Sequence, residues 1–488
     1  MIFNSVTFII FLGFVVFVFW QLNSRYKTIF LVLSSCVFYG FWRWDFIPLI
    51  FVSAINDFYI SKVIYKTPQF KKYKRKFLLS ISIFLNLGLL FYFKYLYFFL
   101  ENSNLLFEFL NLDLNFKLFY IILPFGISFY TFETISYTVD VYRGILKPEK
   151  KFIDYALFVT FFPKLVAGPI QRANELIPQF KNWRTFELSF FSYGLKRILY
   201  GLFLKVVFAD NIGSIVDEIY LINYDFASAI DVLTMSFLFG FQIYFDFSAY
   251  SHIALGSALL FGIKIPENFN FPYIAISLKD FWKRWHISLS AWIRDYLYLP
   301  LSGVKVFNSS GQVGIGKVLS DSKKKRSNIP LFVTWAIMGL WHGANWTFLF
   351  WGLFHAFFIF LERLFKPLRN KFSWLNIKLF NWGITLIISM LSWIPFRVNS
   401  IEETFLLYSK LFDFNNFFNL SFRENSYIIT LLILLIFICS YYFKQLVVPR
   451  LKNNHIIFLI YTFFKYLLLV FLTIIFLKPV NQFIYFQF

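Results

Sequence analysis

The sequence predicts an all-helical protein that crosses a membrane several times. Of the 488 residues, 59% are hydrophobic and 24% aromatic, whereas only 15% are charged. Apolar runs recur at lengths near the ~20 residues that cross a bilayer, and a soluble chain of this size needs more polar surface. We expect about ten to twelve hydrophobic helices, some of them re-entrant or interfacial.

The charge of the loops predicts which side of the membrane each one faces. Residues 6–21 form the first span, which lacks a signal-peptide cleavage site and is therefore expected to be retained. Two apolar runs follow near 28–42 and 46–60. The loop 61–76 carries seven lysines and arginines and no acid. It should therefore lie in the cytoplasm.

The next crossings place the N-terminus outside. The run 77–100 leads out, the acidic segment 101–116 lies outside, and the run 118–139 returns. Basic residues between 143 and 151 then mark the cytoplasm again. Counting back from these loops puts the first residue on the outer side.

The middle of the chain departs from simple spans. Prolines, glycines and basic residues interrupt 152–210, which predicts re-entrant or interfacial helices on the cytoplasmic side. The run 229–263 is apolar with a polar insert. Residues 302–328 are rich in Gly and Ser and then basic, which is typical of a flexible cytoplasmic loop. The runs 331–347 and 348–361 form either two spans or a re-entrant hairpin.

The C-terminal part continues the same pattern. Residues 362–378 are basic and should be inside, 397–426 should be outside, and 456–478 form the last span. We find no internal repeat, so we expect one integral-membrane domain. Within 1–488 it has N-terminal spans, core motifs and C-terminal spans, at 1–151, 160–361 and 362–488.

Composition also argues against several other classes. The net charge of +21 fits loop residues that set topology better than it fits a nucleic-acid-binding protein. Cys36 and Cys439 lie in apolar runs and suggest small buried hydrophobes. A zinc site needs three or four ligands, and no carboxylate lies within a helical turn of a central histidine. No metal is expected.

Four of the five histidines fall between residues 241 and 361, among tryptophans, serines and charges. Ionisable residues in hydrophobic spans are costly, so each is a functional candidate. They are His252, His286, His342 and His355.

If residues 279–295 form one helix, that helix has a cationic face and an aromatic face. The first face carries Lys279, Lys283, His286, Ser290 and Arg294, and the second carries Trp285, Leu289 and Trp292. The pattern suits an interfacial helix with a tryptophan belt. It suits equally a cationic wall for a phosphate-bearing ligand, with His286 near the reacting group.

The WHGANW stretch predicts a second polar group inside an apolar hairpin. On a helix, His342, Asn345 and Trp346 share one face, and Gly343 allows close approach of a backbone or ligand. A histidine in apolar surroundings stays neutral, which suits a general base. A structural histidine bonded to a neighbouring helix is the alternative. His355 has no polar partner beside it in sequence and is a weaker candidate.

Five motifs together resemble the membrane-bound O-acyltransferase family, in particular its bacterial alginate O-acetylation branch. They occur in family order. They are FPKLVAGPIQR (162–172), YFDFSAYSHIALG (244–256), NFNFPY (268–273), DFWKRWHISLSAWIRDYLYLPL (280–301) and LWHGANWTFLFWG (340–352). One departure is the longer Ser/Gly-rich insert that begins at Ser302 and Gly303.

This resemblance implies a ring of spans around a thinned centre crossed by a tunnel, in the bacterial inner membrane. His342 matches the family's catalytic histidine and His286 its second histidine. The resemblance implies cytosolic acetyl-CoA as donor substrate, with no bound cofactor. It also implies an envelope polysaccharide as acceptor on the outer side, and a periplasmic or membrane-anchored partner protein. Expected substrate-binding residues are Lys283, Arg284, Trp285, Ser290, Arg294, Trp341, Asn345 and Trp346, with Arg172 behind the cationic ones.

Within this reading, the chemistry has two open routes. His342 accepts the proton of the attacking hydroxyl, or it forms a covalent acyl-histidine. Asn345 or a tryptophan N–H is expected to stabilise the oxyanion. Asp246 and Asp295 are expected to pair with arginines.

Two other functions compete with this one. D-alanyl transfer from a carrier protein to teichoic acid keeps the family and changes the substrate. A transporter or flippase also fits broken helices with buried histidines, although it lacks support from an internal repeat.

Overall fold

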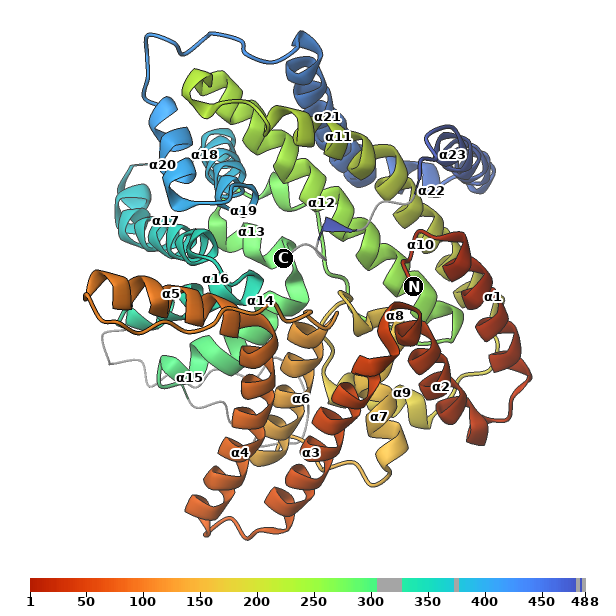
Figure 1. Ribbon diagram of the computed structural model, residues 1–488. Coiled ribbons are helices and arrows are strands. Elements are labelled where there is room, and N and C mark those ends of the chain that lie inside the picture. Colours follow the sequence, from red (N-terminus) through yellow and green to blue (C-terminus); the bar gives the residue numbers. More distant parts are fainter. Residues whose placement is uncertain (305–326, 373–376, 480–482, 485–488) are drawn as a thin grey trace.

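The computed structural model describes residues 1–304, 327–372, 377–479 and 483–484, which are helical and contain no strand (Figure 1). Within these residues, eight helical segments are long and apolar enough to cross a membrane, and two apolar helices are shorter. The prediction of an all-helical polytopic membrane protein is confirmed. The eight segments are Ser24–Lys66, Lys72–Phe109, Leu188–Ile219, Ala229–Leu260, Trp346–Arg369, Lys378–Arg397, Glu424–Lys452 and His455–Ile475; the shorter two are Val6–Gln21 and Ile329–His342.

The N-terminal helices form one side of the molecule, where α3, α4 and α6 pack together. Their bounds are α1 (Val6–Gln21), α2 (Ser24–Arg43), η1 (Trp44–Phe46), α3 (Ile47–Lys66), α4 (Lys72–Leu90), the π-helical turn η2 (Phe91–Tyr95), α5 (Leu96–Phe109) and α6 (Ile127–Tyr142).

The span predicted over 118–139 begins later than expected. The chain from 112 to 124 has no helix, and α6 starts only after Gly126, whose φ is +77°. Asn104 explains part of this, because its side chain exchanges two hydrogen bonds with the backbone of Phe116, at 2.7 and 2.8 Å. These bonds hold the segment back against α5 and replace helical ones.

The next helices build the middle of the molecule, with α10 packed along the 32-residue α12 that crosses the centre of Figure 1. Their bounds are α7 (Phe152–Thr160), α8 (Phe162–Leu165), α9 (Ala173–Lys181), α10 (Leu188–Phe203), the π-helical turn η3 (Leu204–Ala209), α11 (Asp210–Ile219), η4 (Tyr224–Phe226) and α12 (Ala229–Leu260).

The prediction for 152–210 is correct only in part. Helices α7, α8 and α9 are short, but α10 to α11 form one continuous helical segment that is apolar enough to span the membrane. Lys205 argued against a span in the sequence. In the structure it is buried and paired with Asp246 at 2.6 Å and Asp210 at 2.9 Å, so its charge is compensated inside the protein.

The remaining helices complete the other side of the molecule. Their bounds are η5 (Pro272–Ile274), α13 (Leu278–Arg284), α14 (Ile287–Ile293), the π-helical turn η6 (Arg294–Tyr298), α15 (Leu299–Leu301), α16 (Ile329–His342), α17 (Trp346–Lys371), α18 (Lys378–Leu391), α19 (Ile394–Arg397), α20 (Ile401–Lys410), α21 (Glu424–Tyr442), the π-helical turn η8 (Phe443–Val447), α22 (Val448–Lys452) and α23 (His455–Ile475).

Two predictions concern the region around α16. The runs 331–347 and 348–361 become a hairpin of two packed helices, of which only α17 reaches the length of a span. The predicted flexible loop 302–328 lies outside the described residues, except at its two ends.

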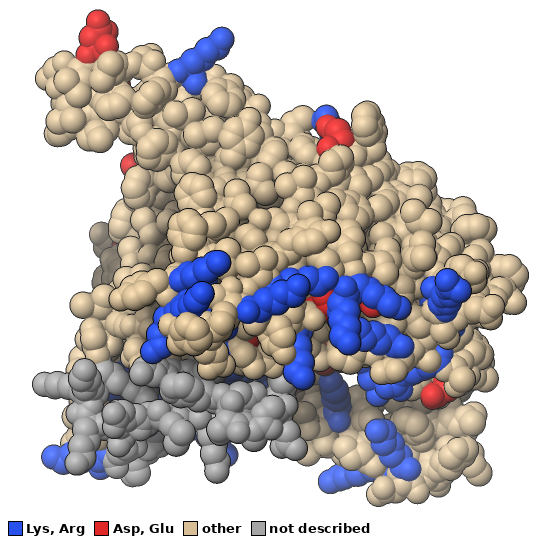
Figure 2. Space-filling model, turned by 90° about the horizontal axis from the view of Figure 1, so that it is seen from below, with Lys and Arg blue, Asp and Glu red and all other residues tan. Residues whose placement is uncertain are grey.

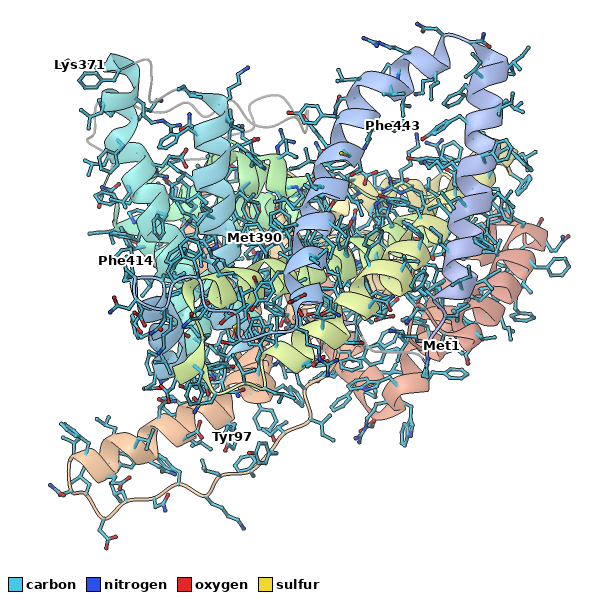
Figure 3. The ribbon with its side chains drawn as sticks, turned by 90° about the horizontal axis from the view of Figure 1, so that it is seen from above. Met1, Tyr97, Lys371, Met390, Phe414 and Phe443 are labelled. Carbon is cyan, nitrogen blue, oxygen red and sulfur yellow. The ribbon has the colours of Figure 1, made fainter. Side chains whose placement is uncertain are left out.

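The two faces of the molecule differ in charge. Met1 and Tyr97 lie toward one face in Figure 3, and Lys371 and Phe443 lie toward the opposite face. Lysines and arginines gather in the lower half of Figure 2, while the upper half shows few charges. This arrangement agrees with the charge pattern that the loops predict.

Candidate active site

His342 is the last residue of α16. The helix ends there because Gly343 is extended, with φ −159° and ψ 150°. The Phe348 ring occupies the space of a Cβ at Gly343, since that atom would lie 2.0 Å from Phe348 Cε2. The predicted helical face shared by His342, Asn345 and Trp346 is therefore wrong, because two helices meet within the motif.

Two further glycines set the position of α16 against α17. A Cβ on Gly339 would lie 2.2 Å from the Phe348 carbonyl oxygen, and one on Gly352 would lie 2.1 Å from the Trp335 carbonyl oxygen. The two backbones are therefore in direct contact, as small residues allow in membrane helix pairs.

His342 lines a small cavity of about 50 Å³ and is 6% exposed. The wall comes from three parts of the chain: Lys94 on η2, residues 123–129 at the start of α6, and Val166 after α8. Trp341 completes it beside the histidine. The predicted catalytic histidine therefore borders a cavity that three other parts of the chain help to build.

A second cavity of about 170 Å³ adjoins the first and shares Phe125 and Val166 with it. Met1 and Tyr39 also line this second cavity. Met1, which lines the second cavity, lies toward the face described above (Figure 3).

Sequence analysis missed Lys94. Its ammonium donates to the carbonyl oxygens of Trp341, at 2.7 Å, and His342, at 2.9 Å. The neighbouring Tyr95 hydroxyl donates to the Leu340 carbonyl at 2.9 Å. A single lysine within the apolar run 77–100 was the signal that could have identified it.

His286 lies between two helices and not within one. Its φ is +41°, which separates α13 from α14, and its side chain is fully buried. The predicted single amphipathic helix over 279–295 is therefore wrong. The cationic face is divided too, since Lys279 and Lys283 are exposed while His286 is not.

Asn268 holds this junction. Its backbone carbonyl accepts from Ile287 N at 3.0 Å, and its side-chain oxygen accepts from Ser288 N at 3.2 Å and Ser288 Oγ at 2.9 Å. The same oxygen lies 3.2 Å from His286 Nδ1. Since the amide oxygen only accepts, Nδ1 carries the proton, and Nε2 of the neutral ring is an acceptor.

Trp341 connects the two predicted histidines. Its ring centroid lies 4.9 Å from that of His342 and 6.3 Å from that of His286. Phe129 also contacts both His286 and Trp341. Among the described residues, no acceptor bonds the buried Trp341 Nε1, so this N–H can donate to a ligand.

The other two histidines of this region are placed elsewhere. His355 packs between Trp335 and Trp351, and its Nδ1 accepts from Trp282 Nε1 at 3.4 Å. His252 packs on Tyr200. Neither histidine lines the His342 cavity.

Three arginines form a cluster around Asp295. Arg172 and Arg294 form ion pairs with its carboxylate, and Arg143 donates to its backbone carbonyl at 3.3 and 3.4 Å. Burial alone would raise the pKa of Asp295, but the hydrogen bonds from Arg294 and Arg172 hold it below its usual value. The prediction that Asp295 pairs with arginines is confirmed. Asp246 pairs with Lys205 instead.

The remaining predicted site residues do not line the His342 cavity. Lys283 is exposed, Arg284 pairs with Asp280 at 3.0 Å, and the Ser290 hydroxyl donates to the carbonyl of the buried Trp285.

The end of the WHGANW motif also points away from the cavity. The Asn345 side chain caps α17 through Thr347 N and donates to the Asn399 carbonyl. Trp346 is 49% exposed and donates to Asn102 Oδ1 at 2.7 Å. Neither supports the expected role at the substrate.

Comparison with known proteins agrees with the motifs. The profile of the membrane-bound O-acyltransferase family matches residues 146–402. Peptidoglycan O-acetyltransferase of Helicobacter pylori is 35% identical over 427 residues, which is 80% of this chain and 75% of that protein. The probable alginate O-acetylase AlgI of Azotobacter vinelandii is 34% identical over 450 residues, 91% and 85% of the two chains.

A further relative is the teichoic acid D-alanyltransferase of Bacillus subtilis, 31% identical over 255 residues, 51% of this chain and 61% of that protein. The family profile covers more than half of the chain, and relatives above 30% identity cover most of it. The chain therefore belongs to the membrane-bound O-acyltransferase family and is an O-acyltransferase.

Proposed function

We propose that this protein transfers an acetyl group from acetyl-CoA to a polysaccharide of the cell envelope, across the bacterial inner membrane. The observation that carries this proposal is the placement of two sites at opposite ends of α6. Residues 127–129 at its start line the His342 cavity, and Arg143 follows its end. A helix of 16 residues is roughly 24 Å long, which is most of the ~30 Å depth of a bilayer core.

The basic face is the donor side in this proposal, and the Met1 face is the outer side. Acetyl-CoA carries phosphates, which arginines bind through paired N–H donors. Arg143, Arg172 and Arg294 supply such donors around Asp295, at the end of α6 away from the cavity. The outer loop around 397–426 is one surface for the partner protein that completes transfer to the polymer.

His342 is the general base. It takes the proton of the acceptor hydroxyl while that oxygen attacks the thioester carbon, and it returns the proton to the departing thiolate. Trp341 Nε1 donates to the acyl oxygen, because it is a buried donor that no described acceptor bonds. His286, fixed by Asn268, lies beside Trp341 and helps to position that ring for the reaction.

Relatives favour acetyl over D-alanyl transfer. The two O-acetylation relatives match 80% and 91% of this chain, whereas the D-alanyltransferase matches 51%.

The test compares donors in membranes that contain wild type, His342→Ala, His286→Ala or His455→Ala at matched expression. His455 is exposed and serves as the control histidine. We expect label from acetyl-CoA to reach envelope glycan with wild type and His455→Ala, and not with His342→Ala. Transfer from an alanyl carrier and not from acetyl-CoA would overturn the donor, and full activity of His342→Ala would overturn the base. Label trapped on His342 itself would show the covalent route.

A further inference from the structure

Lys94 occupies an unusual place for a lysine. It lies inside the segment Lys72–Phe109, which is apolar enough to span the membrane, at a five-residue π-helical turn. Such turns are frequent at functional sites, and a charge within an apolar span is costly unless it has partners or a role.

Part of its role is structural. The last carbonyls of a helix have no N–H of their own helix to bind. Lys94 and Tyr95 supply donors to three consecutive carbonyls at the end of α16, those of Leu340, Trp341 and His342. This fixes the helix end that carries His342.

Capping alone leaves part of the ammonium unused. An ammonium has three donors, and within the described chain it bonds two carbonyls and no carboxylate. Lys94 also lines the cavity with His342 and Trp341. Its third hydrogen and its charge are therefore available to a group bound there.

The start of α6, which also lines the cavity, favours a negatively charged group there, as Lys94 does. Residues 126–129 begin α6, so the positive end of this helix lies at the cavity. Gly126 brings the helix start close to α8, because a Cβ there would lie 2.4 Å from the Leu165 carbonyl oxygen. A developing negative charge in this cavity meets an ammonium and a helix N-terminus.

We propose that Lys94 is a catalytic residue that stabilises the oxyanion of the acyl transfer. The acceptor oxygen forms a bond to the thioester carbon, the carbonyl electron pair moves to oxygen, and His342 holds the hydroxyl proton. Lys94 donates a hydrogen bond to that oxyanion and keeps its own proton. The pair then returns, the carbon–sulfur bond breaks, and the thiolate takes the proton from His342. This inference rests on the proposed acetyl transfer.

The first test replaces the ammonium by an amide, as Lys94→Gln, which can still donate to both carbonyls. We expect kcat for transfer from labelled acetyl-CoA to fall about 10²–10³-fold, as on loss of one oxyanion donor. KM for acetyl-CoA should be unchanged, because the lost interaction forms only in the transition state. Lys117→Gln, on the exposed stretch 112–120, is the matched control.

A second test separates charge from folding. Lys94→Cys, in a Cys36→Ala and Cys439→Ala background, is alkylated either with 2-bromoethylamine or with iodoacetamide. The first restores an ammonium, and the second gives a neutral amide donor. Recovery of kcat by aminoethylation alone supports the proposal. Equal activity of the two products, or near wild-type kcat in Lys94→Gln, overturns it.

The same assay distinguishes the two levels of inference. If wild type transfers acetyl groups from acetyl-CoA and Lys94→Gln does so at the same rate, only the role of Lys94 is contradicted. If wild type transfers no acetyl group from acetyl-CoA, the proposed function is contradicted, and so is the role of Lys94.

Discussion

Individual hydrogen bonds decide what the two central histidines can do. At His286, Asn268 fixes the ring and the backbone of the junction together. At His342, Lys94 fixes the helix end and faces the same cavity. Asn268 and Lys94 thus each help to position one of the two histidines.

Replacing Asn268 by Ala should lower activity about tenfold or more, because it leaves buried donors of His286 and Ser288 unpaired at about 1–3 kcal/mol each. The rate of acetyl transfer in membranes measures this. Asn270→Ala is the control, since Asn270 is exposed two residues away. Equal activity of the two variants would show that Asn268 does not position His286.

The Asp295 ion pairs should stabilise the protein above about pH 4 and not below. Its pKa is lowered in the folded protein, so its contribution is present above the unfolded value near 3.9 and is lost as the pH falls through the folded value. We expect Asp295→Asn to be less stable than wild type by about 1–3 kcal/mol at pH 7 and at pH 5.5.

Melting temperatures in detergent at several pH values check this. The difference should shrink as the pH falls below about 4, and Asp113→Asn, at an exposed acid, should show none. A difference that grows with acidity would contradict the assigned pairing.

The sequence identified candidate residues more reliably than it predicted which residues lie beside them in the fold. The sequence drew attention to His342 and His286 because charges in apolar runs are rare, and the same argument applies to Lys94, which was overlooked. Helical spacing placed Asn345 and Trp346 on one face with His342, and the family resemblance implied that they bind the substrate. That spacing holds only within one helix, and Gly343 ends α16 between them and His342.

The same limit appears at the scale of elements. Apolar runs predicted most long helices, because a bilayer requires them. The break at His286 could not be predicted, since it depends on hydrogen bonds from Asn268, 18 residues earlier. The span from Leu188 to Ile219 was missed because the partners of Lys205 lie on the helix itself and on α12.

Packing of α16 on α17 gives a prediction for the glycines. Gly339→Ala and Gly352→Ala should each destabilise the protein by about 1–3 kcal/mol and reduce acetyl transfer, because the added methyl groups meet backbone atoms. Gly383→Ala in α18 should be neutral or slightly stabilising, since no atom lies within 4 Å of its Cβ. Thermal unfolding of the three variants decides this, and unchanged stability of both hairpin variants would contradict the close contact.

At the scale of the molecule, Phe483 and Ile484 belong to the core. Phe483 is 1% exposed, packs on Tyr250 and lies 4.6 Å below the Lys205 ammonium. The Ile484 N–H donates to Asp246 at 2.7 Å. These contacts join the C-terminal segment to α12 and to the paired charges between α12 and η3.

Removing the Phe483 ring should therefore destabilise the protein. Phe483→Ala should lower the free energy of unfolding by about 3–5 kcal/mol, whereas Phe414→Ala, at a side chain 78% exposed, should have little effect. Melting temperatures in detergent compare the two. Equal values would mean that the C-terminal segment does not stabilise the core.

The arginine cluster and the His342 cavity lie at opposite ends of α6, so a donor bound at one end can react with an acceptor at the other. This is tested most directly in sealed inverted membrane vesicles given labelled acetyl-CoA on the outside only, which is the former cytoplasmic side. We expect label to accumulate on glycan enclosed within the vesicles, and His342→Ala to abolish it. Transfer only to acceptors on the same side as acetyl-CoA would contradict a site reached from both faces.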